Sequence, residues 1–345
     1  MNSAGAASTG ARPLISIVVP CYNEQLSLHP LHKAVTEAFA SRQDLRYEFV
    51  FVDDGSGDRT AEILRELAAR DSHLTVVTLS RNFGQQPAFS AGLRHATGDA
   101  VILCDADMQD RPETMLEMVD RWREGADVVY GVRSRRKETG MMRAVYFGFY
   151  RLLKLLADTD IPLDSGDFGL MDRKVVDAVN ALPERNRFMR GLRSWVGYKQ
   201  VPLVYERQAR LAGKSKYSLA GLIRLASDGI FDFSTKPLTV VFFLGLAASV
   251  LSLVGFIFFL LHRIIGFKVL GHSPAEVPGI ASVILAVFFL GGVQLLAIGV
   301  LGEYVARIYA EVKRRPGFIV KSLTRGRDST VEAADDRPDD TNASS

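Results

Sequence analysis

The chain has 345 residues, 48% of them hydrophobic, and a formal net charge of +3. This length accommodates one large domain with accessory segments. The small net charge says little by itself, and we expect no nucleic-acid partner. The two cysteines, Cys21 and Cys104, lack the spacing of a zinc site and fit reduced, partly buried thiols better than a disulfide.

Apolar runs and amphipathic segments alternate through the first part of the chain. Residues 1–12 have no apolar core of the signal-peptide kind and are predicted to form a disordered leader. From Leu14 to about Gly131 the alternation is typical of a mostly parallel sheet with flanking helices. The expected strands are 15–20, 48–53, 74–79, 100–104 and 128–131, and the expected helices are 28–40, 60–70, 86–96 and 113–124.

Polar residues gather directly after the expected strands. Ligands of an open α/β sheet bind beyond the carboxyl ends of its strands, so these residues predict an active-site edge. Tyr22 could stack on a base, Asp53 or Asp54 could accept from a base or ribose, and Gly55 would allow close backbone approach. For Asp54 and Ser56, capping of the next helix explains the residues equally well.

The most informative run follows the fourth expected strand, where Asp105, Asp107 and Gln109 stand at alternate positions. Oxygen ligands of this kind hold Mg²⁺ or Mn²⁺ while substrate phosphates and water complete the coordination. The run therefore predicts a metal that assists the departure of a nucleoside diphosphate. The alternative is a set of solvated or helix-capping carboxylates, which are common after strands.

Two amphipathic segments follow this region. In residues 141–156 and 218–233, apolar side chains recur at every third or fourth position, with basic residues on the other side of the first segment. We expect the first to lie in a lipid headgroup region and the second to form a juxtamembrane helix. Packing against the catalytic domain is the alternative for both.

Two long stretches near the C-terminus, 237–261 and 277–301, carry no charge. Each exceeds the roughly 20 apolar residues that cross a bilayer core, so we predict a transmembrane hairpin rather than a buried helix pair. Its outer flanks carry Lys236, Arg307, Lys313, Arg314, Arg315, Lys321, Arg325 and Arg327, whereas the linker has only Arg263 and Lys268. The positive-inside rule then predicts a multi-pass plasma (inner) membrane protein with a cytoplasmic catalytic domain.

Six motifs, in this order, resemble a known family. They are VVPCYNE at 18–24, VDDGSGDRT at 52–60, SRNFG at 80–84, DADMQDRPE at 105–113, SGDFGLMDR at 165–173 and RLAGKSKYS at 210–218. With the paired apolar stretches, they resemble the family 2 inverting glycosyltransferases of GT-A fold that act on polyprenyl phosphates. The chain is similar to the bactoprenol glucosyltransferases and to dolichyl-phosphate mannose synthase.

This resemblance implies roles for individual residues. The implied nucleotide-sugar contacts are Pro20, Tyr22, Glu24, Asp53, Asp54 and Asp105. The implied ligands of Mg²⁺ or Mn²⁺ are Asp105, Asp107 and Gln109, and the implied contacts to the donor diphosphate or acceptor phosphate are Arg133, Arg143, Arg210 and Lys216. Asp167 is implied to lie near the reacting sugar, with Asp105 as the second catalytic carboxylate; for Arg133 and Arg143 a solvated or headgroup-facing charge is the alternative.

The implied reaction transfers one sugar, with UDP-glucose the first choice of donor, to a polyprenyl phosphate such as undecaprenyl phosphate. An acceptor phosphate has a second pKa of about 6 and is largely anionic already. Asp167 could therefore orient the sugar or stabilise positive charge instead of acting as a base. The alternatives are a processive polysaccharide synthase of the same family and a catalytically silent membrane anchor or assembly subunit.

The expected organisation follows from these motifs. It comprises a leader (1–12), a cytoplasmic GT-A catalytic domain (13–217), a juxtamembrane helix (218–236), a first span (237–261), an extracytoplasmic linker (262–276), a second span (277–303) and a basic segment with a disordered tail (304–345). Gly245, Gly291 and Gly292 would permit close helix contacts in a homo-oligomer, and packing of the two spans within one chain explains them equally well.

Overall fold

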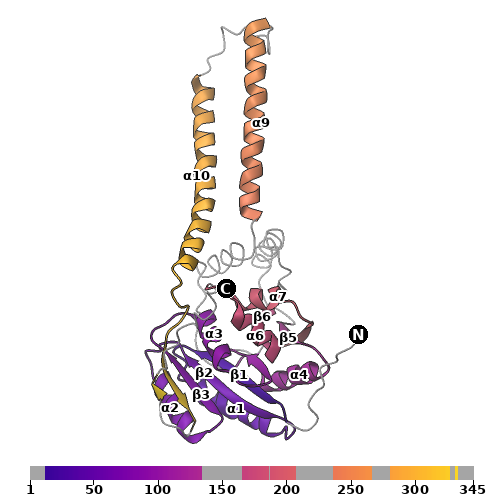
Figure 1. Cartoon of the computed structure of the whole chain (residues 1–345), viewed down its shortest axis with the longest axis vertical. Coiled ribbons are helices and arrows are strands. Elements are labelled where there is room, and N and C mark those ends of the chain that lie inside the picture. The colour runs from indigo at the N-terminus through magenta and orange to yellow at the C-terminus, as the bar shows by residue number, and fades with distance from the viewer. Residues whose placement is uncertain are drawn as a thin grey trace, which may run out of the picture. The chain divides into compact units, whose positions relative to one another are not determined.

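The computed structural model describes residues 12–133, 165–185, 187–206, 236–265, 280–326 and 331–332. They form two compact units, an α/β unit and a pair of long helices (Figure 1). The elements of the α/β unit are β1 (Leu14–Cys21), α1 (Leu28–Ala40), β2 (Arg46–Asp53), α2 (Thr60–Arg70), β3 (Leu74–Leu79), α3 (Gln85–His95), β4 (Ala100–Leu103), α4 (Pro112–Arg123), β5 (Val128–Arg133), β6 (Ser165–Asp172), α6 (Arg173–Ala181), α7 (Met189–Trp195), β7 (Gln200–Tyr205), β8 (Val320–Arg325) and β9 (Val331–Glu332).

In the part of the chain that is described, nine strands form one sheet in the order β7-β5-β6-β4-β1-β2-β3-β8-β9. Strands β4, β1, β2 and β3 are parallel, because each connection between β1, β2, β3 and β4 passes through a crossover helix. This confirms the expected α/β sheet with flanking helices. The sheet as a whole is mixed, since β6 and β8 run antiparallel to their neighbours β4 and β3.

Helices cover both faces of the sheet. The apolar residues of α1 recur at three- and four-residue spacing and are all buried, namely Leu28, Leu31, Val35 and Phe39. Together with residues of α2 and α4 they pack against one face, in a cluster that contains Phe49 and Phe51. Helix α3 packs on the other face so tightly that a Cβ at Gly92 would lie 2.2 Å from the side chain of Val18. This contact fixes α3 on the centre of the sheet.

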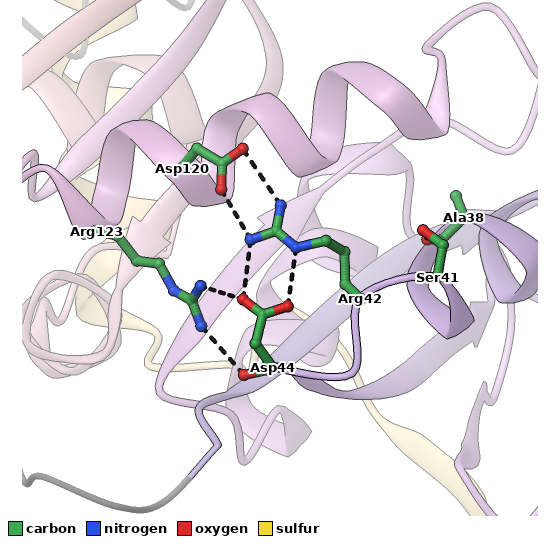
Figure 2. Close-up of polar contacts among 6 residues, drawn as sticks. All are labelled: Ala38, Ser41, Arg42, Asp44, Asp120 and Arg123. Carbon is green, nitrogen blue, oxygen red and sulfur yellow. Dashed lines mark hydrogen bonds and ion pairs between the residues drawn. The ribbon is translucent and has the colours of Figure 1, made fainter.

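A polar network joins the turn after α1 to helix α4 (Figure 2). Arg42 donates to Asp44 at 2.9 and 3.1 Å and to Asp120 at 2.9 and 3.3 Å, and Arg123 donates to the same Asp44 carboxylate. Hydrogen bonds from Arg42 and Arg123 hold the pKa of Asp44 well below its usual range. Because both carboxylates are about half exposed, we expect each pair to contribute about 1 kcal/mol or less.

Strand β8 was not predicted from the sequence. It lies within residues 304–345, expected to be a basic segment and a disordered tail; there Val320–Arg325 pair antiparallel with β3, and Val331–Glu332 extend the sheet further. Gly326 donates its N–H to the carbonyl of Leu74 at 2.8 Å, which closes the far end of β8 on the sheet. The chain that follows the second apolar stretch thus completes the sheet.

The second unit contains α9 (Lys236–Ile265) and α10 (Ile280–Val312), which lie side by side (Figure 1). In the described chain these two helices are long and apolar enough to cross a membrane, by length and composition. The qualifying segments are Leu238–Gly255 and Ala286–Val312, with mean hydropathies of 2.3 and 1.8, and no part of either is buried. Large apolar side chains such as Leu251 and Phe288, 71% and 76% exposed, argue against a buried pair.

Candidate active site

The sheet brings residues of the first five predicted motifs to one edge, which we call the rim and define as residues 20–25, 53–58, 80–86, 104–110 and 165–168. The parallel strands β1 to β4 end at the rim, and the antiparallel strand β6 begins there. Leu103 of β4 pairs with Gly169 of β6. Asp105 and Asp167 each lie two residues beyond this pair, so two predicted catalytic carboxylates reach the same edge from distant parts of the sequence.

Hydrogen bonds join the loops after β1 and β2. Asn23 donates its backbone N–H to Ser56 Oγ at 3.1 Å, and its side-chain oxygen accepts from the N–H of Gly57 at 2.9 Å. The N–H of Glu24 donates to Thr60 Oγ1 at 2.9 Å. Asn23 has a φ of 55°, a conformation that is uncommon for a residue with a side chain and often occurs at functional sites. These hydrogen bonds therefore hold the loops after β1 and β2 together.

The implied nucleotide contacts from the first motif lie at the end of β1 and in the loop that follows it. Pro20 is within β1 and pairs in register with Val52. Tyr22 is 40% exposed, so its ring is accessible to a ligand. The carboxylate of Glu24 accepts from Ser27 Oγ at 3.1 Å, next to the start of α1.

Asp53 and Asp54 are buried and hold loops in place. Asp53 accepts from the N–H of Ser56 at 3.1 Å, and Asp54 accepts from the N–H groups of Phe83 and Gly84 at 2.7 and 2.8 Å. Burial raises the pKa of Asp54, against the lowering effect of these two N–H groups. The interpretation of Asp54 and Ser56 as caps of α2 is wrong, because Asp58 accepts from the first N–H of that helix. Direct nucleotide contact by Asp53 or Asp54 stays a prediction.

We expect Asp54→Asn to lower the free energy of unfolding by about 1.5 kcal/mol, because an amide offers one oxygen where the carboxylate offers two. One of the two loop N–H groups would then face an NH₂ group. Thermal unfolding of the purified full chain should show a midpoint about 3 to 6 °C lower. Asp177→Asn, at an exposed position on α6, is the control and should leave the midpoint unchanged. Equal midpoints for both variants would show that the hydrogen bonds of Asp54 to the loop after β3 do not stabilise the fold.

The acidic cluster forms a tight turn after β4. Asp105 Oδ1 accepts from Gln85 Nε2 at 2.7 Å, and Asp107 Oδ1 accepts from the N–H of Gln109 at 3.2 Å. Met108, between them, has a φ of 61°, a backbone conformation that costs energy for a residue with a Cβ. A strained turn of this kind fits a ligand site better than a passive connection.

The donor set of this turn fits a hard divalent cation. Within the described residues, no group of three or more His, Cys, Asp or Glu could hold a metal ion. Mg²⁺ is commonly held by one or two carboxylates with substrate phosphates and water. Asp107 is buried, with 7% of its surface exposed, and hard oxygen ligands from Asp105, Asp107 and Gln109 match that pattern. A metal at this turn would need the substrate to complete its coordination.

Asp110 closes the same loop through a contact to β7, the terminal strand of the described sheet. Its buried carboxylate accepts from the hydroxyl of Tyr205 at 2.8 Å. Tyr205 is the last residue of β7 and immediately precedes the basic segment that holds Arg210 and Lys216. The contact therefore joins the predicted metal loop to the start of the predicted acceptor segment.

We expect Tyr205→Phe to lower the free energy of unfolding by about 2 kcal/mol, because a buried carboxylate loses a hydrogen-bond donor while the ring remains. Tyr198→Phe removes a hydroxyl from a ring that is 46% exposed and serves as the matched control. Thermal unfolding compares the two variants. A Tyr205→Phe protein as stable as the control would show that this hydrogen bond contributes nothing.

Asp167 is held from two sides. Its Oδ1 accepts from Arg190 Nε at 3.0 Å, and its Oδ2 accepts from Gln86 Nε2 at 3.0 Å. Only 8% of the Asp167 side chain is exposed. Arg193, one helical turn after Arg190, lies over the ring of Tyr130 at 5.3 Å, and burial lowers its pKa to about 10 against the raising effect of Asp167. The carboxylate thus lies beside two guanidinium groups of α7.

Several predicted residues are not placed. Arg133 ends β5 and pairs in register with Tyr205, but its side chain is outside the described atoms. The remaining phosphate contacts, Arg143, Arg210 and Lys216, lie outside the described residues, as do the amphipathic segments 141–156 and 218–233. Conversely, sequence reasoning missed Gln85, Gln86 and Arg190. Gln85 and Gln86 directly follow the SRNFG motif, which was the available signal, whereas nothing in the sequence marked Arg190.

The comparisons with known proteins agree with this geometry. A family model described as Glycosyl transferase family 2 matches residues 16–179, from β1 into α6. The SfII prophage-derived bactoprenol glucosyl transferase of Shigella flexneri is 43% identical over 314 residues, which cover 90% of this chain and 99% of that protein. The chain belongs to glycosyl transferase family 2.

Two more relatives of this glycosyltransferase match over similar lengths. The glycosyltransferase YkcC of Bacillus subtilis (strain 168) is 45% identical over 307 residues, or 89% of this chain and 93% of that protein. The prophage bactoprenol glucosyl transferase homolog of Escherichia coli (strain K12) is 39% identical over 312 residues, or 90% and 99%. Family membership and the α/β sheet with flanking helices together confirm the GT-A fold class expected from the sequence.

Proposed function

We propose that this glycosyltransferase moves one sugar, with inversion, from a nucleotide-sugar donor to a polyprenyl phosphate at the cytoplasmic face of the plasma membrane. UDP-glucose is the first candidate donor. The observation that carries the proposal is the meeting of Asp105, Asp107 and Asp167 at one rim, in a chain with two helices apolar enough to span a bilayer. The 43% identity to a bactoprenol glucosyl transferase over almost the whole chain supports the acceptor class.

The donor half of the reaction uses the rim loops. Tyr22 offers an exposed ring for the base, and Pro20, Glu24, Asp53 and Asp54 shape the loops around it. Asp105, Asp107 and Gln109 would hold Mg²⁺ or Mn²⁺ against the diphosphate. A bound divalent cation would supply Lewis-acid stabilisation of the leaving diphosphate.

Asp167 suits an electrostatic role. Both of its oxygens accept hydrogen bonds, from Arg190 and Gln86. An acceptor phosphate with a second pKa of about 6 is largely ionised at neutral pH and needs no strong base. Asp167 would therefore orient the sugar or stabilise the positive charge that develops at its anomeric carbon. The donor diphosphate or the acceptor phosphate would be bound by Arg133, Arg143, Arg210 and Lys216.

The connectivity of the chain supports the proposed topology. Strand β3 precedes α9 and strand β8 follows α10, yet the two strands pair in one sheet. If α9 and α10 both cross the membrane, their outer ends must lie on the same side, because both connect to the α/β unit. The basic residues that flank those ends favour the cytoplasm for that side by the positive-inside rule. A homo-oligomer through the two helices is part of the proposal.

Mass spectrometry of lipid extracts tests the reaction. The detergent-purified full chain is incubated with undecaprenyl phosphate and a panel of nucleotide sugars, with Mg²⁺, with Mn²⁺ or with EDTA. We expect one donor to yield a lipid that has gained a single sugar, and EDTA to abolish the product. Repeated sugar addition would instead favour a processive synthase. No glycolipid from any donor, with a folded protein, would favour a silent anchor or assembly subunit.

A further inference from the structure

Two consecutive glutamines hold the two predicted catalytic carboxylates. Gln85 and Gln86 form the first turn of α3. Gln85 Nε2 donates to Asp105 Oδ1 at 2.7 Å, and Gln86 Nε2 donates to Asp167 Oδ2 at 3.0 Å. Asp105 follows β4, which ends at the rim, and Asp167 belongs to β6, which begins there. One helical turn therefore connects the donor side of the site to the sugar side.

Gln86 is itself held at both ends of its amide. Its Oε1 accepts from the N–H of Met189, the first residue of α7, at 2.8 Å. The next residue, Arg190, donates to the other oxygen of Asp167 at 3.0 Å. Gln86, Asp167 and Arg190 thus form a closed arrangement in which each carboxylate oxygen has a donor of its own. Because the amide of Gln86 has a donor on one side and an acceptor on the other, its orientation is fixed.

The turn that carries the glutamines is a rigid support. Asp54 binds the N–H groups of Phe83 and Gly84, immediately before α3. Farther along the helix, Gly92 lets α3 pack directly on the side chains of Val18 and Val52. The start of α3 is therefore anchored by the loop after β2, and its body is anchored by the sheet. The backbone that carries the two glutamines is therefore held on both sides.

We propose that Gln85 and Gln86 are positioning residues that set the separation of Asp105 from Asp167, and hence the position of the sugar relative to the leaving diphosphate. This inference rests on the proposed function. A glutamine suits the task because it donates a hydrogen bond to a carboxylate without adding a charge. A lysine in either place would neutralise the carboxylate, and a second carboxylate would repel it.

The two glutamines should act on different kinetic constants. Asp105 belongs to the predicted donor and metal site, so Gln85→Leu should raise the metal concentration required for half-maximal activity by about 10-fold. Asp167 faces the reacting sugar, so Gln86→Leu should lower kcat by about 10- to 100-fold with little change in the KM for the nucleotide sugar. Gln43→Leu, an exposed glutamine in the turn after α1, is the matched control and should change neither.

A charged substitution gives a signature that a purely structural role would not produce. In Gln86→Glu the introduced carboxyl contacts Asp167, and two carboxylates in contact share one proton. Its protonated form still donates a hydrogen bond to Asp167. We expect the activity of this variant, relative to wild type, to fall as the pH rises and the shared proton is lost. Flat relative activity from pH 5.5 to 8.5 would overturn the role of Gln86.

Crystal structures of wild type and Gln86→Leu separate this inference from the proposed function. We expect the Asp167 carboxylate to rotate away from its wild-type position in the variant. An unmoved Asp167, or equal kinetic effects of the two leucine variants, would overturn the positioning role. If wild type makes no glycolipid from any donor, the proposed function fails by itself, and the position of Asp167 in the two structures still decides the inference.

Discussion

Replacing Asp107 with alanine should lower sugar transfer by roughly 1000-fold, while the protein stays folded. Metal stabilisation of a leaving diphosphate contributes several kcal/mol, and each 1.4 kcal/mol corresponds to about a tenfold change in rate. Asp107 is buried in the turn after β4, where its carboxylate would be a ligand of the metal. Transfer is measured as glycolipid formed per unit time at saturating donor.

The same assay on Asp177→Ala provides the control, because that carboxylate is 63% exposed and lies on α6 away from the rim. Loss of the hydrogen bond from Gln109 to Asp107 costs about 1 kcal/mol, so the thermal midpoint of Asp107→Ala should fall by only a few degrees. A variant that transfers sugar at the wild-type rate would remove Asp107 from the metal site. If Asp107→Ala does not fold, the same transfer assay is made with Asp107→Asn, which keeps the volume of the side chain.

Gly55→Ala should lower the free energy of unfolding by about 3 kcal/mol. Gly55 has a φ of 66°, where a Cβ costs roughly 1 to 2 kcal/mol. An added Cβ would also lie 2.5 Å from the carbonyl carbon of Arg81 and 2.7 Å from the nitrogen of Asn82. Both are backbone atoms, so the loops after β2 and β3 must separate, at a further cost of about 1 to 3 kcal/mol.

Gly57→Ala is a control in the same loop, because a Cβ there meets nothing within 4 Å among the described atoms and its φ is ordinary. Thermal unfolding should show a midpoint about 6 to 12 °C lower for Gly55→Ala and an unchanged midpoint for Gly57→Ala. Separation of the loops would also disturb Phe83 and Gly84, which Asp54 binds. Equal midpoints for the two variants would show that the close approach has no energetic consequence.

Local patterns in the sequence predicted the first half of the fold well. The strands and helices from β1 to α4 were expected within about two residues of their observed ends, because each combines a clear apolar period with turn residues at its limits. Strand β6 was not expected. Its sequence, SGDFGLMD, contains Gly166, Gly169 and two aspartates, which are depleted in strands. It forms a strand because β4 and β5 provide partners on both sides.

The residues of the candidate site were likewise only partly predictable from the sequence. Asp105, Asp107, Gln109 and Asp167 were recognisable because their motifs are short and contiguous. Their partners were not, since the hydrogen bonds of Asp167 come from residues on α3 and α7 that are distant in the sequence. Asp54 had two local interpretations, and the structure shows a third role, as the acceptor for the loop after β3.

The sequence by itself determined the alternation of strands and helices, the two apolar helices, the motif residues and the family, because each is encoded in local composition and spacing. Only the tertiary structure decided that Val320–Arg325 complete the sheet, that Gln85 and Gln86 bind different carboxylates, and that Asp105 and Asp167 meet at one edge. These contacts join residues that are far apart in the chain. They depend on strand register and loop packing, which the whole fold determines and no local pattern specifies.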